Sequence, residues 1–352
     1  MRYIGNKENL VQPIYSAMQS MGINGTSFFD VFSGTTSVAK FFKKLGYKIF
    51  SSDLMYYSYV LQKASIENNN EPKFISLLPH LGNIEVSSLF ATPLQKVLEY
   101  LNNITQKKGF IYNNYTPEGS FDAIIPRMYY TGDNGIFIDK VRIQIDEWLK
   151  NKLINEFEFF ILIAALIETV PFYANISGVY AAFHKKWDSR ALKKMYLREP
   201  EIIINSHENT VFQKDSLKLL NEVEADIFYL DPPYNQRQYA PNYHLLETIA
   251  KYDDPEIKGI SGIRDYSEQK SRFCNIKTAL DDLEKIVKNG KYKHLLLSYN
   301  NEGIMPEASI LEILNYKGSN VEIFNFDYLR FKSNNKGKNN KFIKERLYIL
   351  SK

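Results

Sequence analysis

The sequence predicts an α/β protein built on a mostly parallel sheet. Strand and helix patterns alternate near the N-terminus and again after about residue 200. Between these stretches, helical patterns and polar loops replace the alternation. We therefore predict one sheet domain formed by residues 1–54 and 200–352, with residues 55–199 as a largely helical insertion.

The first β-α-β unit lies close to the N-terminus. Residues 26–29 predict a strand that ends at Asp30, and residues 37–45 have helical spacing. Residues 48–52 predict a second strand, which leads to Asp53. A crossover helix joins parallel strands, so this unit predicts the start of a parallel sheet.

The alternation returns in the second half of the chain, and it ends in a predicted hairpin. Within the insertion, residues 143–149 and 157–170 are predicted helices. The elements expected after residue 200 are strands at 210–213, 226–230 and 294–299, helices at 216–223 and 278–287, and terminal strands at 321–331 and 342–350 around a polar tip.

Composition excludes several classes of protein. The chain has a single cysteine, Cys274, and five histidines, so we expect neither a disulfide framework nor a metal site. The sequence has no segment typical of a signal peptide and no apolar run of membrane-spanning length, so we expect a cytoplasmic protein without membrane contact. A net charge of +4 is compatible with nucleic-acid binding without indicating it.

The first β-α-β unit predicts a cofactor site. Asp30, Phe32 and Gly34 lie in the turn after the first strand, where nucleotide-like ligands approach a parallel sheet. An acidic residue in the place of Asp53 typically accepts hydrogen bonds from ribose. No glycine-rich phosphate loop is present, which favours a ribose ligand without phosphates, such as S-adenosylmethionine. A tight turn with a helix cap is the structural alternative.

The clearest chemical signal is the run Asp231, Pro232, Pro233 and Tyr234 after a buried strand. Proline cannot donate to a neighbouring strand, so the backbone leaves the sheet here. The carboxylate of Asp231 and the carbonyl of Pro232 can accept the two N–H bonds of a ring amino group, and Tyr234 can stack on that ring. A base in a duplex would have to be flipped out to reach them. These four residues alone do not show whether the ring is adenine or cytosine, or whether the run is a functional site or only a proline-rich turn.

Several blocks, taken in order, resemble the D12 class of DNA N6-adenine methyltransferases, the group that includes the Dam-type methylases. The family often has a second glycine two places after the position of Gly34, where this chain has Thr36. The matching blocks are residues 2–7 (RYIGNK), 30–35 (DVFSGT), Asp53, Asp215, 231–234 (DPPY) and the closing strand 345–349 (ERLYI).

The resemblance implies a Rossmann-like S-adenosylmethionine-dependent methyltransferase with an inserted target-recognition domain. It implies methyl transfer to N6 of adenine at a specific site in double-stranded DNA, in a restriction-modification or related epigenetic system with a possible cognate restriction endonuclease. Tyr3 and Lys7 would contact the methionine part of the cofactor, and Asp215 would lie near its adenine. The alternatives are an inactive nucleic-acid-binding protein with this fold, or methylation of RNA or a protein amide.

Basic residues supply candidate DNA contacts. Arg237 follows the run at Asp231 directly, and four lysines lie on or beside the tip of the final hairpin. A solvated loop is the alternative for such a run of charge. The four lysines are Lys332, Lys336, Lys338 and Lys341, and the candidate base-reading residues of the insertion are Asn113, Asn114, Arg127 and Lys185.

Overall fold

The chain folds into two compact units. The structure, a computed structural model, describes residues 5–82, 91–316, 320–329 and 342–351. The first unit, here called the sheet unit, consists of residues 5–62, 203–240 and 267–352. The second, the helical unit, consists of residues 1–4, 63–202 and 241–266. Residues 241–266 therefore group with the helical unit, whereas the sequence-based boundaries assigned them to the sheet domain.

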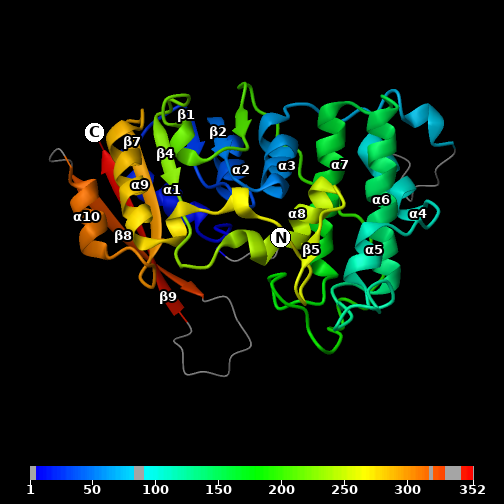
Figure 1. Cartoon of the computed structure of the whole chain (residues 1–352). Coiled ribbons are helices and arrows are strands. Elements are labelled where there is room, and N and C mark those ends of the chain that lie inside the picture. The colour runs from blue at the N-terminus through cyan, green and yellow to red at the C-terminus, as the bar shows by residue number, and fades with distance from the viewer. Residues whose placement is uncertain (1–4, 83–90, 317–319, 330–341, 352) are drawn as a thin grey trace. The chain divides into compact units, whose positions relative to one another are not determined.

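The sheet unit contains a seven-stranded sheet in the order β3-β2-β1-β4-β7-β9-β8 (Figure 1), which confirms the predicted α/β class. The first five strands in this order are parallel to one another, and β9 is antiparallel to both β7 and β8. Their bounds are β1 (Ser27–Asp30), β2 (Lys48–Ser52), β3 (Thr210–Phe212), β4 (Ile227–Leu230), β7 (His294–Asn300), β8 (Val321–Leu329) and β9 (Phe342–Ser351).

Strand order reverses between β1 and β4. The chain runs outward from β1 to β2 and β3, and then returns to the other side of β1 to form β4. Ligands of open α/β sheets bind at such a switch point, outside the carboxyl ends of the strands. All four residues of β4 are buried, as expected for a central strand with both faces covered.

Four of the five predicted helices are confirmed: those at 37–45, 157–170 and 278–287 match helices of similar bounds, and 143–149 is the later part of a longer helix that begins at Gly132. The predicted helix at 216–223 is only a 3-10 turn, Ser216–Leu219. The helices of the sheet unit are α1 (Val11–Ser20), α2 (Ser37–Lys44), α3 (Tyr56–Gln62), α9 (Ile276–Asn289) and α10 (Glu307–Leu314).

The helical unit is organised by its two longest described helices, α6 and α7, which pack against each other. No helix in the described part of the chain is long and apolar enough to cross a membrane. The elements of the unit are α4 (Pro93–Asn103), α5 (Phe110–Tyr115), α6 (Gly132–Lys150), α7 (Glu156–Thr169) and the short strands β5 (Ile257–Lys258) and β6 (Ile263–Arg264); α8 (Tyr239–Lys251) begins in the sheet unit and continues into this one.

A single residue, Asp226, joins the amino ends of three central strands. Its Oδ2 accepts hydrogen bonds from the backbone N–H groups of Thr26 (2.8 Å) and Ser27 (3.1 Å) at the start of β1. Its own backbone carbonyl accepts from Lys293 and His294 at the start of β7. Burial acts to raise the pKa of Asp226, but the hydrogen bonds from Lys293, Thr26 and Ser27 hold that pKa below its usual range.

We expect Asp226→Asn to lower the free energy of unfolding by about 2 kcal/mol at pH 7, because these hydrogen bonds lose their charge. Since the pKa is depressed, the stabilisation is present above the unfolded value of about 3.9 and is lost as the pH falls below it. Urea unfolding at several pH values measures the difference. Asp281→Asn, at an exposed position of α9, is the control. A difference that persists undiminished at low pH would contradict the assignment.

Candidate active site

Four acidic residues follow four adjacent parallel strands. Asp30 ends β1, Asp53 follows β2, Asp215 follows β3 and Asp231 follows β4. The register aligns Asp30 with Ser51 of β2 and with Tyr229 of β4. The structure therefore brings these predicted site residues to one edge of the sheet, at its switch point.

Asp53 shapes the turn that follows β1. Its Oδ2 accepts a hydrogen bond from the N–H of Gly34 (2.8 Å), and its Oδ1 accepts one from the N–H of Met55 (2.8 Å). Thr36 is buried in the left-handed conformation, with φ of 64°. Left-handed backbone is costly for a β-branched residue, so the position that the family often gives to glycine is a strained one here.

Asp30 presents a buried acceptor at the same edge. Its Oδ2 accepts a hydrogen bond from the hydroxyl of Ser33 (3.2 Å). Its Oδ1 is buried and has no hydrogen-bond partner among the residues that the structure describes. Burial raises the pKa of Asp30 to about 7, and the charges of Asp231 and Asp53 act in the same direction.

A buried lysine lies beside the predicted catalytic carboxylate. Lys7 is 4% exposed, and its Nζ is 3.1 Å from Asp231 Oδ1 and 2.8 Å from Glu345 Oε1. Burial acts to lower the pKa of Lys7, but the two carboxylates raise it overall. The pKa of Asp231 is raised to about 6 because burial and the Glu345 charge outweigh the attraction of Lys7.

Tyr234 takes part in the same cluster through its hydroxyl group. The hydroxyl contacts Lys7 Nζ and Asp231 Oδ1, and it lies 2.6 Å from Glu345 Oε1. The Tyr234 ring packs edge-on against Tyr299, with ring centroids 5.1 Å apart. Desolvation and the neighbouring carboxylates raise the pKa of Tyr234, so it is a neutral phenol.

Glu345 is a member of this cluster to which sequence reasoning assigned no role. It lies on β9, only 2% exposed, and also accepts a hydrogen bond from the Ser298 hydroxyl (2.7 Å). The sequence could have indicated this role, because side chains two positions apart in a strand lie on the same face, and Leu347 and Ile349 on the face of Glu345 are buried. A carboxylate on the buried face of a strand requires a partner.

The comparisons with known proteins place the chain in a family. A model of the D12 class N6 adenine-specific DNA methyltransferases matches residues 3–313. The chain belongs to this family. It is 40% identical over 342 residues to the Type II methyltransferase M.FokI of Planomicrobium okeanokoites, which covers 96% of this chain and 50% of that protein.

Two further relatives differ in length. The Modification methylase StsI of Streptococcus sanguinis is 36% identical over 359 residues, with 100% of this chain and 52% of that protein covered. The Type II methyltransferase M.NlaIII of Neisseria lactamica is 35% identical over 336 residues, with 95% of this chain and 93% of that protein covered. This chain thus spans about half the length of the first two relatives and nearly all of the third.

The other predicted site residues of this chain lie in different surroundings. Phe32 packs edge-on against Phe273 at 5.1 Å, and Asp215 Oδ1 caps the N–H of Leu217 (2.9 Å). Arg237 is exposed on the loop after Tyr234. Tyr3 and the hairpin lysines Lys332, Lys336, Lys338 and Lys341 lie outside the described residues.

Arg127 of the helical unit, a candidate base reader, has a structural role. Its guanidinium donates hydrogen bonds to the carbonyls of Ile260 (3.0 Å), Asn114 (3.2 Å) and Gly259 (3.3 Å). These bonds tie the tip between β5 and β6 to the end of α5. The guanidinium is therefore engaged with main-chain atoms, which leaves it poorly placed to read a base edge.

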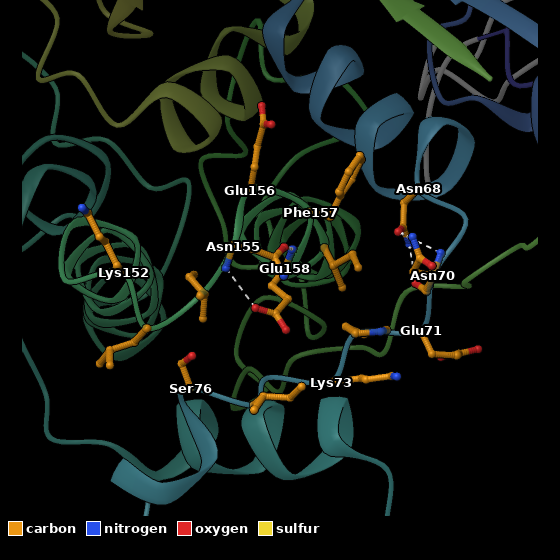
Figure 2. A pocket seen from close by; sticks show the side chains of 15 residues that line it. Asn68, Asn70, Glu71, Lys73, Ser76, Lys152, Asn155, Glu156, Phe157 and Glu158 are labelled. Atoms are coloured by element: carbon orange, nitrogen blue, oxygen red, sulfur yellow. Dashed lines mark hydrogen bonds between the residues drawn. The ribbon is translucent and has the colours of Figure 1, made fainter. Parts of the chain in front are cut away.

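The helical unit also contains a pocket of about 850 Å³ with a mixed polar and apolar lining (Figure 2). It is lined by the segments 68–76 and 152–161, and none of the predicted site residues belongs to it. Glu158, which lines it, already accepts hydrogen bonds from the N–H groups of Phe74 (2.6 Å) and Asn155 (2.9 Å). The capping pair of Asn155 and Glu158 in Figure 2 thus serves the start of α7.

We expect Lys7→Gln to lower the free energy of unfolding by about 3–5 kcal/mol at pH 7.5, because the buried Glu345 and the partly exposed Asp231 lose their shared cation. The substitution should raise the pKa of Asp231, so the deficit should shrink as the pH falls and this carboxyl is protonated. Urea unfolding at pH 7.5 and pH 5.5 tests both points. Lys44→Gln, at an exposed position of α2, is the control. A deficit below about 1 kcal/mol, the value typical of surface pairs, would contradict the buried ion-pair account.

Proposed function

We propose that this chain is a site-specific DNA adenine-N6 methyltransferase that uses S-adenosylmethionine and acts on duplex DNA. The observation that carries the proposal is the position of Asp231 at the carboxyl end of β4, beside the turn that Asp53 holds after β1. A methyl acceptor and a methyl donor would meet at this edge. The names of the relatives, Type II methyltransferase and modification methylase, support a restriction-modification setting and a cognate endonuclease.

The chemistry of the edge supports S-adenosylmethionine as the cofactor. Asp53 and Asp215 give the edge a negative charge, which suits a cationic ligand and disfavours phosphates. Asp53 can accept hydrogen bonds from ribose hydroxyls, since each carboxylate oxygen has more than one acceptor site. Asp30 adds a buried oxygen that faces this edge without a partner among the described residues. The cofactor would supply an electrophilic methyl group on a sulfonium.

Asp231 and Pro232 would then accept the two N–H bonds of the target amino group. Such acceptors favour a pyramidal nitrogen and offset the positive charge that develops on it. The ion pairs of Lys7 favour a role beside Asp231 over the predicted contact with the methionine carboxylate. Lys7 would keep Asp231 ionised near neutral pH, which the reaction requires of a hydrogen-bond acceptor.

Recognition of DNA would involve both units. The helical unit is the candidate target-recognition region, because it carries none of the residues assigned to chemistry apart from the undescribed N-terminus. In the sheet unit, the loop with Arg237 follows Tyr234 and is anchored by Gln238, which exchanges hydrogen bonds with the backbone of Ser271. The exposed side chain of Arg237 is suited to a DNA phosphate near the flipped base.

Expression of the chain in cells that lack adenine methylation, followed by sequencing that detects N6-methyladenine, tests the function and identifies the site. We expect one short sequence to be methylated, and we expect Asp231→Ala to abolish the mark while cofactor binding persists. Asp281→Ala is the matched control at an exposed position. Methyl transfer from labelled cofactor to RNA or protein extracts but not to DNA would reassign the substrate. The absence of transfer to all three would favour an inactive binding protein.

The hairpin lysines should contribute to DNA affinity by neutralising phosphates. Substituting glutamine for Lys336, Lys338 and Lys341 together should weaken binding and reduce the slope of log affinity against log salt by up to about 3, since each phosphate that a lysine neutralises adds roughly 0.9 to that slope. Fluorescence anisotropy with a duplex at several salt concentrations measures the slope. The matched control substitutes glutamine for Lys277, Lys285 and Lys288 on α9. Equal slopes for the two triple variants would mean that the hairpin lysines face solvent.

A further inference from the structure

Glu345 collects three hydrogen-bond donors on one oxygen. Its Oε1 is 2.8 Å from Lys7 Nζ, 2.6 Å from the Tyr234 hydroxyl and 2.7 Å from the Ser298 hydroxyl. These groups come from the N-terminal segment, the loop after β4, and β7. At 2% exposure, solvent cannot satisfy the carboxylate, so these contacts fix its position.

Among the residues that the structure describes, the cluster has one cation, Lys7, for the two carboxylates of Asp231 and Glu345. If Lys7 paired with Asp231 alone, the ammonium would weaken this carboxylate as an acceptor of further hydrogen bonds. Glu345 competes for the same ammonium at a distance slightly shorter than that of Asp231. The Tyr234 hydroxyl has a single proton, so it donates to one of the two carboxylates at a time.

We propose that Glu345 is a positioning residue for methyl transfer: it holds Lys7 and the Tyr234 hydroxyl in place, so that the Asp231 carboxylate keeps its orientation toward the incoming amino group and does not take the whole charge of Lys7. The inference rests on the proposed function for its catalytic consequence. Its electrostatic consequence concerns Asp231 alone and can be measured without catalysis.

The charged groups around Asp231 determine whether its pKa rises or falls when one of them is removed. Lys7 favours its ionised form, whereas Glu345 and the carboxyl of Asp30 on β1 disfavour it. The phenols of Tyr234 and Tyr229 are neutral because burial raises their pKa values. Loss of the Glu345 charge should therefore lower the pKa of Asp231, and loss of the Lys7 charge should raise it.

The test compares wild type, Glu345→Gln and Glu322→Gln, the last at an exposed glutamate of the neighbouring strand β8. Methyl transfer to duplex DNA is followed across pH at saturating cofactor. Glu345→Gln should lower kcat about 10-fold to 100-fold, as for other residues that orient a functional group. It should move the acidic limb of the kcat profile to lower pH and leave the KM for the cofactor unchanged. A proportional loss at all pH values, with no movement of the limb, would overturn the proposal.

A second readout separates this inference from the proposed function. The titration of Asp231, assigned with Asp231→Asn and followed by NMR of carboxyl-labelled aspartate, should have its midpoint at lower pH in Glu345→Gln than in wild type. An unmoved or raised midpoint overturns the inference even if the chain methylates DNA. A lowered midpoint in a chain that transfers no methyl group to DNA would instead remove the proposed function and its catalytic consequence.

A conservative variant covers the case in which Glu345→Gln does not fold. Glu345→Asp retains the charge but shortens the reach to Lys7. It should lower kcat through poorer positioning and leave the acidic limb closer to that of wild type. Wild-type kcat in Glu345→Asp would show that the exact position of this carboxylate is irrelevant, which would overturn the positioning role.

Discussion

The buried ammonium of Lys7 is the constraint on which the candidate site depends. It joins the N-terminal segment to the loop after β4 and to β9, three parts of the chain that are distant in sequence. A buried ion is costly unless its partners are well placed, so β9 and the loop after β4 must hold their positions relative to each other. The arrangement of the strands therefore fixes the position of the Lys7 ammonium.

The two ends of the central strands serve opposite purposes. At the amino ends, Asp226 has several donors and gives the strands a common starting point. At the carboxyl ends, the buried Asp30 and the partly exposed Asp231 have raised pKa values, which is costly for folding. Strained groups and groups that lack hydrogen-bond partners are characteristic of functional sites. Here the hydrogen bonds at the amino ends of the strands and the packing of the core offset the cost that these carboxyls add to folding.

The helical unit is held together by side chains that bond to main-chain atoms. Asp139 of α6 accepts from the N–H groups of Gly109, Ile111 and Tyr112, and Arg127 donates to three carbonyls. Asp139 thereby caps the start of α5, and Arg127 ties the tip between β5 and β6 to the end of that helix. These contacts also explain why a charged residue of the insertion is a poor guide to base recognition when only its type is known.

Most of the fold follows from local patterns that the sequence displays. The strands around Phe28, Phe50 and Phe228 are indicated by their apolar patterns, and the two prolines after Asp231 stop the third of them. Periodicity failed at Ser216–Leu219, where the structure has a short 3-10 turn instead of the predicted helix. The sequence alone thus determined the sheet and the carboxylate at Asp231. Only the tertiary structure decided that Lys7 and Glu345 meet beside it, because an ion pair across 338 positions depends on how strands assemble rather than on any local pattern.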